Sequence, residues 1–380
     1  MLQFFLVAGC VSRRAGEDMP DAYWRRLAAM LDFVAALREG GDALPMFGDA
    51  DDGYVLDLGS GPGEVSGWLA LGAALLRDEE LARRAGPGRE PVAWLLGREA
   101  VAWLDRVPRP AQAPALASRA FPDSGHYLLQ SGRRGEDDGV SVLFDCGELG
   151  FGSLAAHGHA DALSVSVRVA GHDVLVDPGT YDYFSFPAWR EYFRSTRAHN
   201  TLTLDGLDQS AMLGPFLWGR RAHARCVEWR TDPAAGRSVV IGEHDGYAGL
   251  PAPARHRRTL ELDARTRMLT IRDEIVSAGP HDVALYFHLA EACALLREGE
   301  RAYRLTVGGR SLRLCFDPRL AVRSLSASLD PIAGWVSRGY HLKSPATTLV
   351  ASARCTGDAR FECRLELGGR SEQNPASRRA

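Results

Sequence analysis

Apolar residues recur at two different spacings along the chain, and the spacing changes once. In MPDAYWRRLAAMLDFVAALREGG, residues 19–41, they return every three to four positions, with Pro20 and Asp21 at the start and two glycines at the end. The stretches EVSGWLALGAALLRDEELARRAG and EPVAWLLGREAVAWLDRV repeat this pattern. Residues 1–106 are therefore predicted to form helical hairpins.

A different pattern follows a proline-rich segment. Residues 107–118, VPRPAQAPALAS, hold three prolines among small residues and are predicted to be a linker. Residues 119–367 contain short β-rich runs between Gly, Asp and Asn turns, and LELDARTRMLTIRD has the alternation of a hairpin with one buried face. This region is predicted to be a large antiparallel β-sandwich, and residues 368–380 a disordered tail.

The composition is that of an ordinary soluble globular protein, and its 380 residues suggest two domains. Hydrophobic residues make up 46%, charged residues 24%, and the net charge is -3. No concentrated basic patch indicates a nucleic-acid partner, and no apolar run reaches the roughly 18 residues of a membrane span. Lys343 is the only lysine, which excludes Schiff-base chemistry nearly everywhere.

The N-terminus and the cysteines carry weaker signals. MLQFFLVAGCVSRR resembles a lipoprotein signal with Cys10 as the acylated residue, but no basic residue precedes the apolar run. An apolar helix that ends at Arg13 and Arg14 is the favoured interpretation, so no convincing signal peptide is predicted. The seven cysteines are scattered and never spaced as CxxC, so neither a zinc ribbon nor a disulfide framework is indicated.

The stretch AAHGHADALSV is the strongest candidate for chemistry. It places His157, His159 and Asp161 at alternate positions, which face the same way in a strand. Neutral imidazole is the commonest metal ligand. The competing interpretations are a polar loop and a cupin-type metal site, but a cupin needs a Glu where residues 162 and 163 are Ala and Leu.

Two residues further along could complete a metal site. His159, Asp177 and His199 would supply two nitrogens and one oxygen, as a zinc with one open position requires. If residues 171 and 172 form a turn, Asp177 pairs near Ser166, about 23 Å along a straight strand from His159. Convergence therefore requires the loop before Leu163 to fold back.

Longer segments around these residues resemble a known family. HGHADALSVSVRVAGHDVLVDPGTYDYF, followed by REYFRSTRAHNTLTLDGLDQS, is similar to the heparinase II/III-like polysaccharide lyases. The resemblance implies an N-terminal (α/α) toroid followed by an antiparallel β-sandwich, in an α+β multidomain chain. It also implies β-elimination on an acidic, uronate-containing polysaccharide, a periplasmic or secreted location, and leaves homodimerisation open.

The resemblance also assigns site residues. It points to His157 as a catalytic residue and to His159, Asp177 and His199 as the ligands of one Zn(2+) ion per chain, with Asp161 in support. Tyr181 or Tyr183 could act as an acid or base, or pack a strand end, and Arg194 could contact an acidic sugar or pair with a carboxylate. His244, His256 and His288 are predicted to be structural.

The chain departs from the family's pattern at its N-terminus. In the family a catalytic Tyr, with an Asn or His, precedes the helix that LQFFLVAGCVSRR resembles, so residues 1–106 are interpreted as a toroid remnant. We expect little or no lyase activity from this chain alone, whether the true start lies upstream or the chain is a short relative. The alternatives are a non-catalytic carbohydrate-binding or exopolysaccharide-assembly factor and, third, a metal-dependent hydrolase or cupin-like oxygenase.

Overall fold

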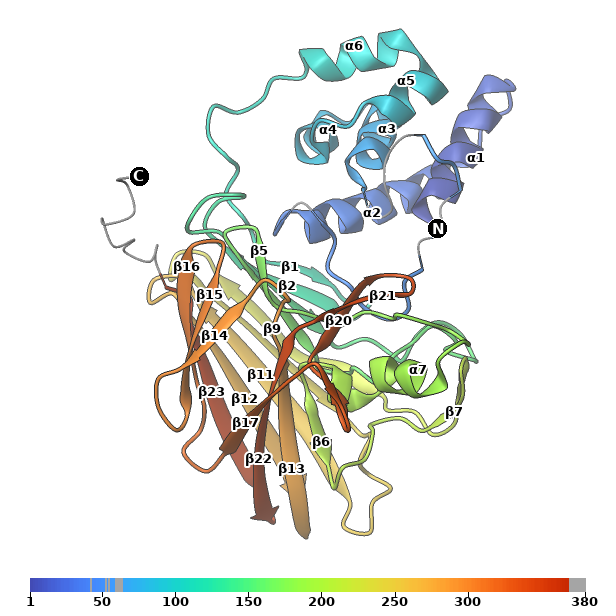
Figure 1. The fold of residues 1–380 in the computed structure, drawn as a ribbon. Coiled ribbons are helices and arrows are strands. Elements are labelled where there is room, and N and C mark those ends of the chain that lie inside the picture. The colour runs from blue at the N-terminus through green and yellow to red at the C-terminus, as the bar shows by residue number, and fades with distance from the viewer. Residues whose placement is uncertain (42, 52, 54, 59–63, 369–380) are drawn as a thin grey trace. The chain divides into compact units, whose positions relative to one another are not determined.

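The chain folds as two units in the computed structural model, which describes residues 1–41, 43–51, 53, 55–58 and 64–368 (Figure 1). One unit comprises Met1–Pro45 and Asp52–Pro114, the other Met46–Asp51 and Ala115–Ala380. The predicted linker contains the boundary after Pro114. Residues 46–51, which the apolar pattern assigned to the helical domain, pack instead with the second unit. The predicted tail, except Gly368, lies outside the described residues.

The first unit is helical. Its described helices are α1 (Leu2–Arg14), α2 (Asp21–Arg38), α3 (Ser66–Leu76), α4 (Glu79–Ala85), α5 (Glu90–Leu96) and α6 (Arg98–Arg106). Helix α3 is apolar around its whole circumference and is buried from Ser66 to Leu75, as expected for a helix at the centre of a bundle. Helix α1 ends at Arg14, as predicted, and its Cys10 is buried.

The second unit is built from β-strands. The eight-stranded sheet has the order β14 (Ala294–Arg297), β15 (Ala302–Val307), β16 (Arg310–Cys315), β23 (Ala359–Glu366), β12 (Met268–Ser277), β11 (Ala254–Asp263), β10 (Arg237–His244), β9 (Ala224–Asp232). A five-stranded sheet has the order β1 (Arg119–Phe121), β2 (His126–Ser131), β3 (Val140–Asp145), β4 (Val165–Val169), β5 (His172–Leu175). A four-stranded sheet has the order β17 (Ala321–Ser326), β22 (Thr347–Thr356), β13 (Pro280–His288), β6 (Leu202–Leu204).

Smaller elements complete the second unit. They are the pairs β7 (Met212–Gly214) with β8 (Leu217–Trp218), β18 (Ser328–Leu329) with β19 (Ile332–Ala333) and β20 (Trp335–Gly339) with β21 (Leu342–Pro345), helix α7 (Pro187–Arg194) and the 3-10 helix η1 (Thr196–Ala198). Helix α7 and the β7–β8 hairpin supply residues of the candidate site described below.

The three larger sheets form a sandwich, as predicted. The five- and four-stranded sheets join into one layer, because the Val176 amide donates to the His288 carbonyl at 3.0 Å. In Figure 1 the four-stranded sheet lies in front of the eight-stranded sheet. One continuous apolar core includes Val142 of β3, Leu285 of β13 and Ile271 of β12. The fold is therefore an antiparallel β-sandwich closed around a single core.

The predicted hairpin in LELDARTRMLTIRD is present as β11 and β12. The strands pair from Ala254 with Ser277 to Asp263 with Met268. Buried and less buried residues alternate along both strands. Because successive side chains of a strand point to opposite faces, one face of this hairpin lies against the core. The seven cysteines are all free thiols in the structure.

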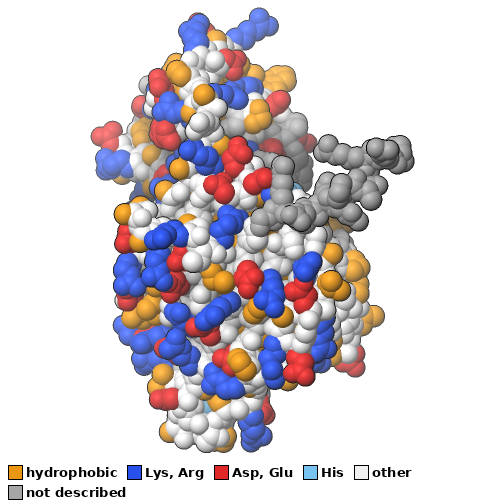
Figure 2. Space-filling model, turned by 90° about the vertical axis from the view of Figure 1, so that its left-hand side faces the viewer, with side chains coloured by type: hydrophobic (Ala, Val, Ile, Leu, Met, Phe, Trp, Pro, Cys, Tyr) orange, Lys and Arg blue, Asp and Glu red, His pale blue; other side chains and the backbone are white. Residues whose placement is uncertain are grey.

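The surface carries both signs of charge. On the face drawn in Figure 2, basic and acidic side chains are interspersed over the part of the chain that the structure describes. Arg272, for example, pairs with Glu261 at 3.3 Å and with Glu362 at 2.6 Å across neighbouring strands. No broad basic area stands out among these side chains. In the described residues, every helix is too short or too polar to cross a lipid bilayer.

The three histidines predicted to be structural, His244, His256 and His288, are each at most 1% exposed. His244 and His256 are bonded to each other at 3.1 Å. His288 contacts the Thr348 hydroxyl and the Arg197 carbonyl. Burial, helped by the charge of His199, lowers the pKa of His288 to about 3, so this ring is neutral in the folded chain at pH 5.

We expect His288 to make the chain less stable as the pH falls. Between pH 6.5 and about 3 the unfolded state binds a proton at this residue and the folded state does not. The contribution between pH 7.5 and pH 5 is about 2 kcal/mol. In urea unfolding, the free energy of unfolding of His288→Gln should fall by about 2 kcal/mol less between pH 7.5 and pH 5 than that of the wild type. His223→Gln, which changes an exposed histidine, should show the wild-type pH dependence. Equal pH dependence of His288→Gln and wild type would contradict this.

Candidate functional site

The loop between β3 and β4 folds back on itself, as convergence of the predicted ligands requires. The amide of Leu163 donates to the Asp145 carbonyl at 2.7 Å, and that of Ala160 donates to the Arg194 carbonyl at 2.9 Å. Ala155 and Leu163 have φ values of 52° and 62°, so the chain reverses at two left-handed residues. HGHAD is therefore a turning loop rather than a straight strand.

This loop brings four buried ligand residues together. One nitrogen or oxygen from each of His159, Asp161, Asp177 and His199 lies within 4.8 Å of the others. His159 Nδ1 is 3.2 Å from His199 Nε2, which is 3.4 Å from an Asp177 carboxylate oxygen. The three residues predicted as metal ligands are thus neighbours, and Asp161 joins them.

The second ring nitrogen of each histidine has its own partner. His199 Nδ1 lies 2.8 Å from the Ser195 carbonyl, which can only accept, so this nitrogen donates. His159 Nε2 lies 2.9 Å from an Asp49 carboxylate oxygen. These contacts leave His159 Nδ1 and His199 Nε2 facing the centre of the cluster.

Burial and charge perturb every group of the cluster. Burial alone would lower the pKa of His199, but the Asp177 carboxylate outweighs it and raises this pKa to about 9. Burial lowers the pKa of His159. Burial, together with the charge of Asp145, raises the pKa of Asp161 well above its ordinary value. Perturbation of this kind concentrates at functional sites.

The donor set of the cluster fits a small cation. Two imidazole nitrogens converge at 3.2 Å beside two buried carboxylates. Two facing nitrogen lone pairs repel unless a proton or a metal ion lies between them. Two nitrogens with one or two oxygens are a common ligand set for zinc.

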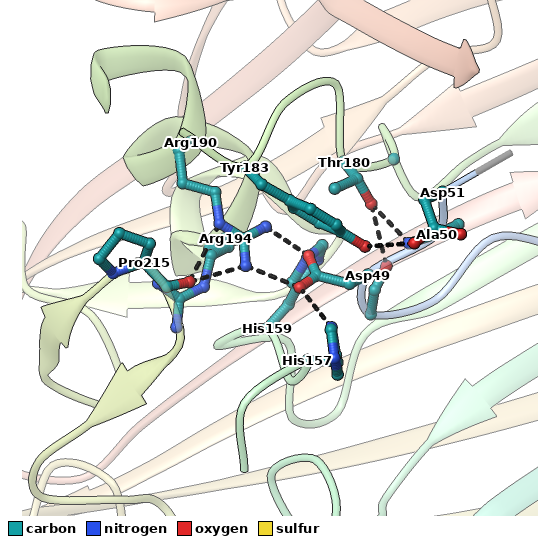
Figure 3. A network of polar contacts seen from close by, with 12 residues as sticks. Asp49, Ala50, Asp51, His157, His159, Thr180, Tyr183, Arg190, Arg194 and Pro215 are labelled. Atoms are coloured by element: carbon teal, nitrogen blue, oxygen red, sulfur yellow. Dashed lines mark hydrogen bonds and ion pairs between the residues drawn. The ribbon is translucent and has the colours of Figure 1, made fainter. Parts of the chain in front are cut away.

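Asp49 is a site residue that the sequence pattern did not indicate. Its carboxylate is fully buried and contacts His157 at 3.1 Å, His159 at 2.9 Å and the Arg190 guanidinium (Figure 3). Burial alone would raise the pKa of Asp49, but hydrogen bonds from His159 and Arg190 lower it to about 2. The carboxylate is therefore ionised and binds three donors.

The segment 46–51 holds Asp49 against the loop. The Asp49 amide donates to the His157 carbonyl at 2.9 Å, and the Ala50 amide donates to the Thr180 hydroxyl at 2.8 Å. A Cβ atom at Gly48 would lie 2.9 Å from that same His157 carbonyl oxygen, and Gly48 has a φ of 58°. Only glycine allows this close approach without strain.

His157 differs from the other site residues because its side chain is 64% exposed. Its ring lies 5.4 Å from the ring of Phe216 and 6.1 Å from that of Tyr183. The Tyr183 hydroxyl is 3.5 Å from a carboxylate oxygen of Asp51. Burial and the charges of Asp49 and Asp51 raise the pKa of Tyr183, so the phenol keeps its proton.

The structure places Tyr181 and Arg194 among other partners. Tyr181 packs in an aromatic cluster with Phe193, and its hydroxyl accepts from Lys343 at 2.8 Å. Arg194 is buried over the Trp218 ring and donates to the Gly214 carbonyl at 2.7 Å. Burial, together with the charge of Arg190, lowers the pKa of Arg194 to about 10. Neither side chain contacts His157.

Two buried polar residues brace the backbone behind the site. The Asn200 amide donates to the Val165 and Val176 carbonyls at 2.8 and 2.9 Å. Arg258 donates to the carbonyls of Leu163 and Asn200. These bonds tie the strand after the histidine loop to the segment after His199, so Asn200 has a structural role here.

Comparison with solved structures identifies the architecture. A heparan sulfate lyase from Pedobacter heparinus aligns with a TM-score of 0.72 at 17% identity, over 97% of this chain and 51% of its own length. A heparinase III gives 0.73 at 13% identity, over 98% and 54%. A chondroitin AC lyase from Streptomyces coelicolor A3 gives 0.50 at 15% identity, over 98% and 52%. The chain thus spans about half the length of these structures and shares their fold.

Comparison at the level of sequence identifies the family. A search among curated protein sequences finds no match. The family model described as heparinase II/III-like, C-terminal, matches residues 113–371. This segment contains the histidine loop, Asp177 and His199. Since the match covers more than half of the chain, the protein belongs to the heparinase II/III-like family, as the motif around its histidine loop predicted.

Proposed function

We propose that this chain contributes to a polysaccharide lyase active site that cleaves an acidic, uronate-containing polysaccharide by β-elimination. Membership in the family supports this reaction class. The observation that carries it is His157, whose ring is 64% exposed while the Asp49 carboxylate beneath it is fully buried. An exposed imidazole anchored on a buried carboxylate is suited to proton transfer with a bound polymer.

His157 is the proposed base. In β-elimination a base removes the proton at C5 of the uronate, the bond from C4 to the leaving oxygen breaks, and that oxygen takes up a proton. Imidazole titrates near neutral pH and can accept the C5 proton. Its position beside Phe216 and Tyr183 leaves one edge of the ring accessible.

Tyr183 is the proposed acid in place of Tyr181. Its ring neighbours that of His157, and its raised pKa keeps the phenol protonated until the leaving oxygen develops charge. Tyr181 contacts Lys343 and the aromatic cluster instead. We assign Arg194 to the support of the loop, since its carbonyl accepts from the Ala160 amide.

We further propose that His159, Asp177 and His199 bind one Zn(2+) ion per chain, with Asp161 beside them. When bound, the ion would hold the histidine loop in its folded-back conformation. One carboxylate oxygen of Asp161 lies within 4.8 Å of a ligand atom of each of the other three, and a bound cation would favour its ionised form. Asp49 links His157 to this cluster, since its carboxylate contacts both His157 and His159.

Two broader features belong to the same proposal. The alignments with solved lyases cover 96–98% of this chain, so we propose that the helices of the first unit form part of an (α/α) toroid. Family resemblance supports a periplasmic or secreted location, where polysaccharide substrates occur.

The test is to follow the ultraviolet absorbance of unsaturated uronate while the chain is mixed with defined oligouronates, and to measure binding in parallel. We expect the chain alone to turn over slowly, and this rate to fall further, by up to about 10²–10⁴-fold, in His157→Gln and to fall in Tyr183→Phe, while His223→Gln keeps the wild-type rate. His223 is an exposed histidine whose partner is Glu148.

The other outcomes are informative. Binding of oligouronates without turnover would replace the lyase by a carbohydrate-binding or exopolysaccharide-assembly factor. Turnover that is unchanged in His157→Gln would remove His157 from the mechanism. Absence of both binding and turnover with every uronate polymer would contradict the proposed substrate class.

A further inference from the structure

We propose that Asp49 is a positioning residue that fixes the tautomers of both histidines of the loop, presenting His157 for proton abstraction and His159 for metal binding. The inference rests on the proposed function. It adds to that function a carboxylate that lies 108 positions before His157 in the sequence and reaches the site through the segment 46–51.

The two oxygens of Asp49 are divided between the two rings. One carboxylate oxygen is 3.1 Å from His157 Nδ1, and the other is 2.9 Å from His159 Nε2. An ionised carboxylate only accepts hydrogen bonds. Both contacts are therefore made by N–H groups, so Asp49 determines which nitrogen carries the proton in each ring.

For His157 this leaves Nε2 as the basic atom. A neutral imidazole carries one N–H, and here it is Nδ1. The free Nε2 lone pair then belongs to a side chain that is 64% exposed. The opposite tautomer would direct its lone pair at the buried carboxylate and offer a substrate only an N–H.

For His159 the same carboxylate leaves Nδ1 as the ligand atom. This nitrogen is 3.2 Å from His199 Nε2 inside the cluster. Metal-binding histidines usually donate their other N–H to a carboxylate or carbonyl, which fixes the ring and raises its basicity. His199 follows the same rule through the Ser195 carbonyl.

Arg190 keeps the shared carboxylate ionised and in place. Its guanidinium binds both Asp49 oxygens and also donates to the Pro215 carbonyl at 3.1 and 2.8 Å. A bidentate Arg–carboxylate pair sets orientation as well as charge. Because Arg190 lies on α7, Asp49 is anchored independently of the two histidines.

The tautomers of the wild-type chain test this proposal directly. Long-range ¹H–¹⁵N spectra of histidine-labelled protein, assigned with His157→Gln and His159→Gln, report the protonated nitrogen of each ring. We expect His157 in the Nδ1–H form and His159 in the Nε2–H form, with and without one equivalent of Zn(2+). A wild-type His157 in the Nε2–H form would overturn the proposal.

Asp49→Asn provides a second, functional readout. An amide has one acceptor and one donor end, so it cannot accept from both rings, and one histidine should switch tautomer. We expect zinc affinity to fall about 10–100-fold and kcat to fall by a similar factor with KM unchanged. The matched control is Asp205→Asn, because Asp205 accepts from His281 Nδ1 at 2.8 Å and touches neither loop histidine.

The outcomes separate this proposal from the proposed function. If no polymer is cleaved, the tautomers and the zinc affinity still test the role of Asp49. If His157 is essential for turnover but Asp49→Asn leaves both tautomers, zinc affinity and kcat unchanged, only the inference about Asp49 is lost. Tighter oligouronate binding or faster turnover in Asp49→Asn would show that Asp49 obstructs the site instead of orienting it.

Discussion

Replacing Arg258 with methionine is expected to lower the free energy of unfolding of the second unit by about 3–5 kcal/mol, because it strands a buried charge. Arg258 is 1% exposed and binds both carboxylate oxygens of Asp273, which is 0% exposed, at 2.7 and 3.1 Å. The substitution would also leave the Leu163 and Asn200 carbonyls without this donor. Urea unfolding followed by circular dichroism measures the loss.

A surface arginine serves as the control. Arg225 binds Glu243 at 3.0 Å, but its side chain is 72% exposed, so Arg225→Met should cost no more than about 0.5 kcal/mol. Adding Asp273→Leu to Arg258→Met should recover part of the stability, since it removes a buried carboxylate that has lost its arginine and keeps only the His256 ring at 2.7 Å as a donor. A cost of Arg258→Met equal to that of Arg225→Met would show that this network is not needed for folding.

Removal of the proposed zinc ion is expected to have the second large effect. A ligand present at 1,000 times its dissociation constant stabilises the folded state by about 4 kcal/mol, so chelation should lower the unfolding free energy by that order. Elemental analysis should find one zinc per wild-type chain and substoichiometric zinc in His199→Ala. His199 is chosen because its Nε2 faces both His159 Nδ1 and the Asp177 carboxylate.

The control for zinc binding is another buried histidine. His288→Gln alters a ring that contacts Thr348 and Arg197 but is outside the ligand cluster, and it should retain one zinc. His159→Ala should lose zinc as His199→Ala does. Unchanged zinc content in either ligand variant would disprove the proposed site, and a chelator that lowers the stability of His199→Ala as much as that of the wild type would show a different metal effect.

The sequence pattern predicted the fold better than it predicted the site. The alternation of apolar and polar residues along β11 and β12 identified a pair of strands, and it also predicted which face of the pair is buried. The histidines and Asp177 were identifiable as candidates because HxH places two imidazoles at alternate positions and because the segments around these residues resemble the heparinase II/III-like family. Their convergence was not predictable from spacing, because it depends on left-handed turns at Ala155 and Leu163, where neither residue type indicates one.

Two residues of the proposed site, Asp49 and Tyr183, could not be singled out from the sequence, for physical reasons. Asp49 sits in the polar sequence GDADD, where nothing distinguishes a buried carboxylate from a solvated one. Tyr181 and Tyr183 are two positions apart and are equivalent in an ideal strand, but Tyr181 has a φ of 66°. That left-handed residue turns one phenol toward Lys343 and leaves the other beside His157.

The placement of residues 46–51 affects how the chain can be divided. A fragment that begins at residue 113 would retain every described strand and the whole family-matched segment, yet it would lack the Asp49 carboxylate. Among the described residues, Arg190, which is 2% exposed, would then keep the Pro215 carbonyl as a hydrogen-bond acceptor and the rings of Tyr183 and Phe216, but no carboxylate to balance its charge. The family-matched segment is therefore not a complete folding unit, because the sandwich packs with residues 46–51, which lie within the helical region of the sequence.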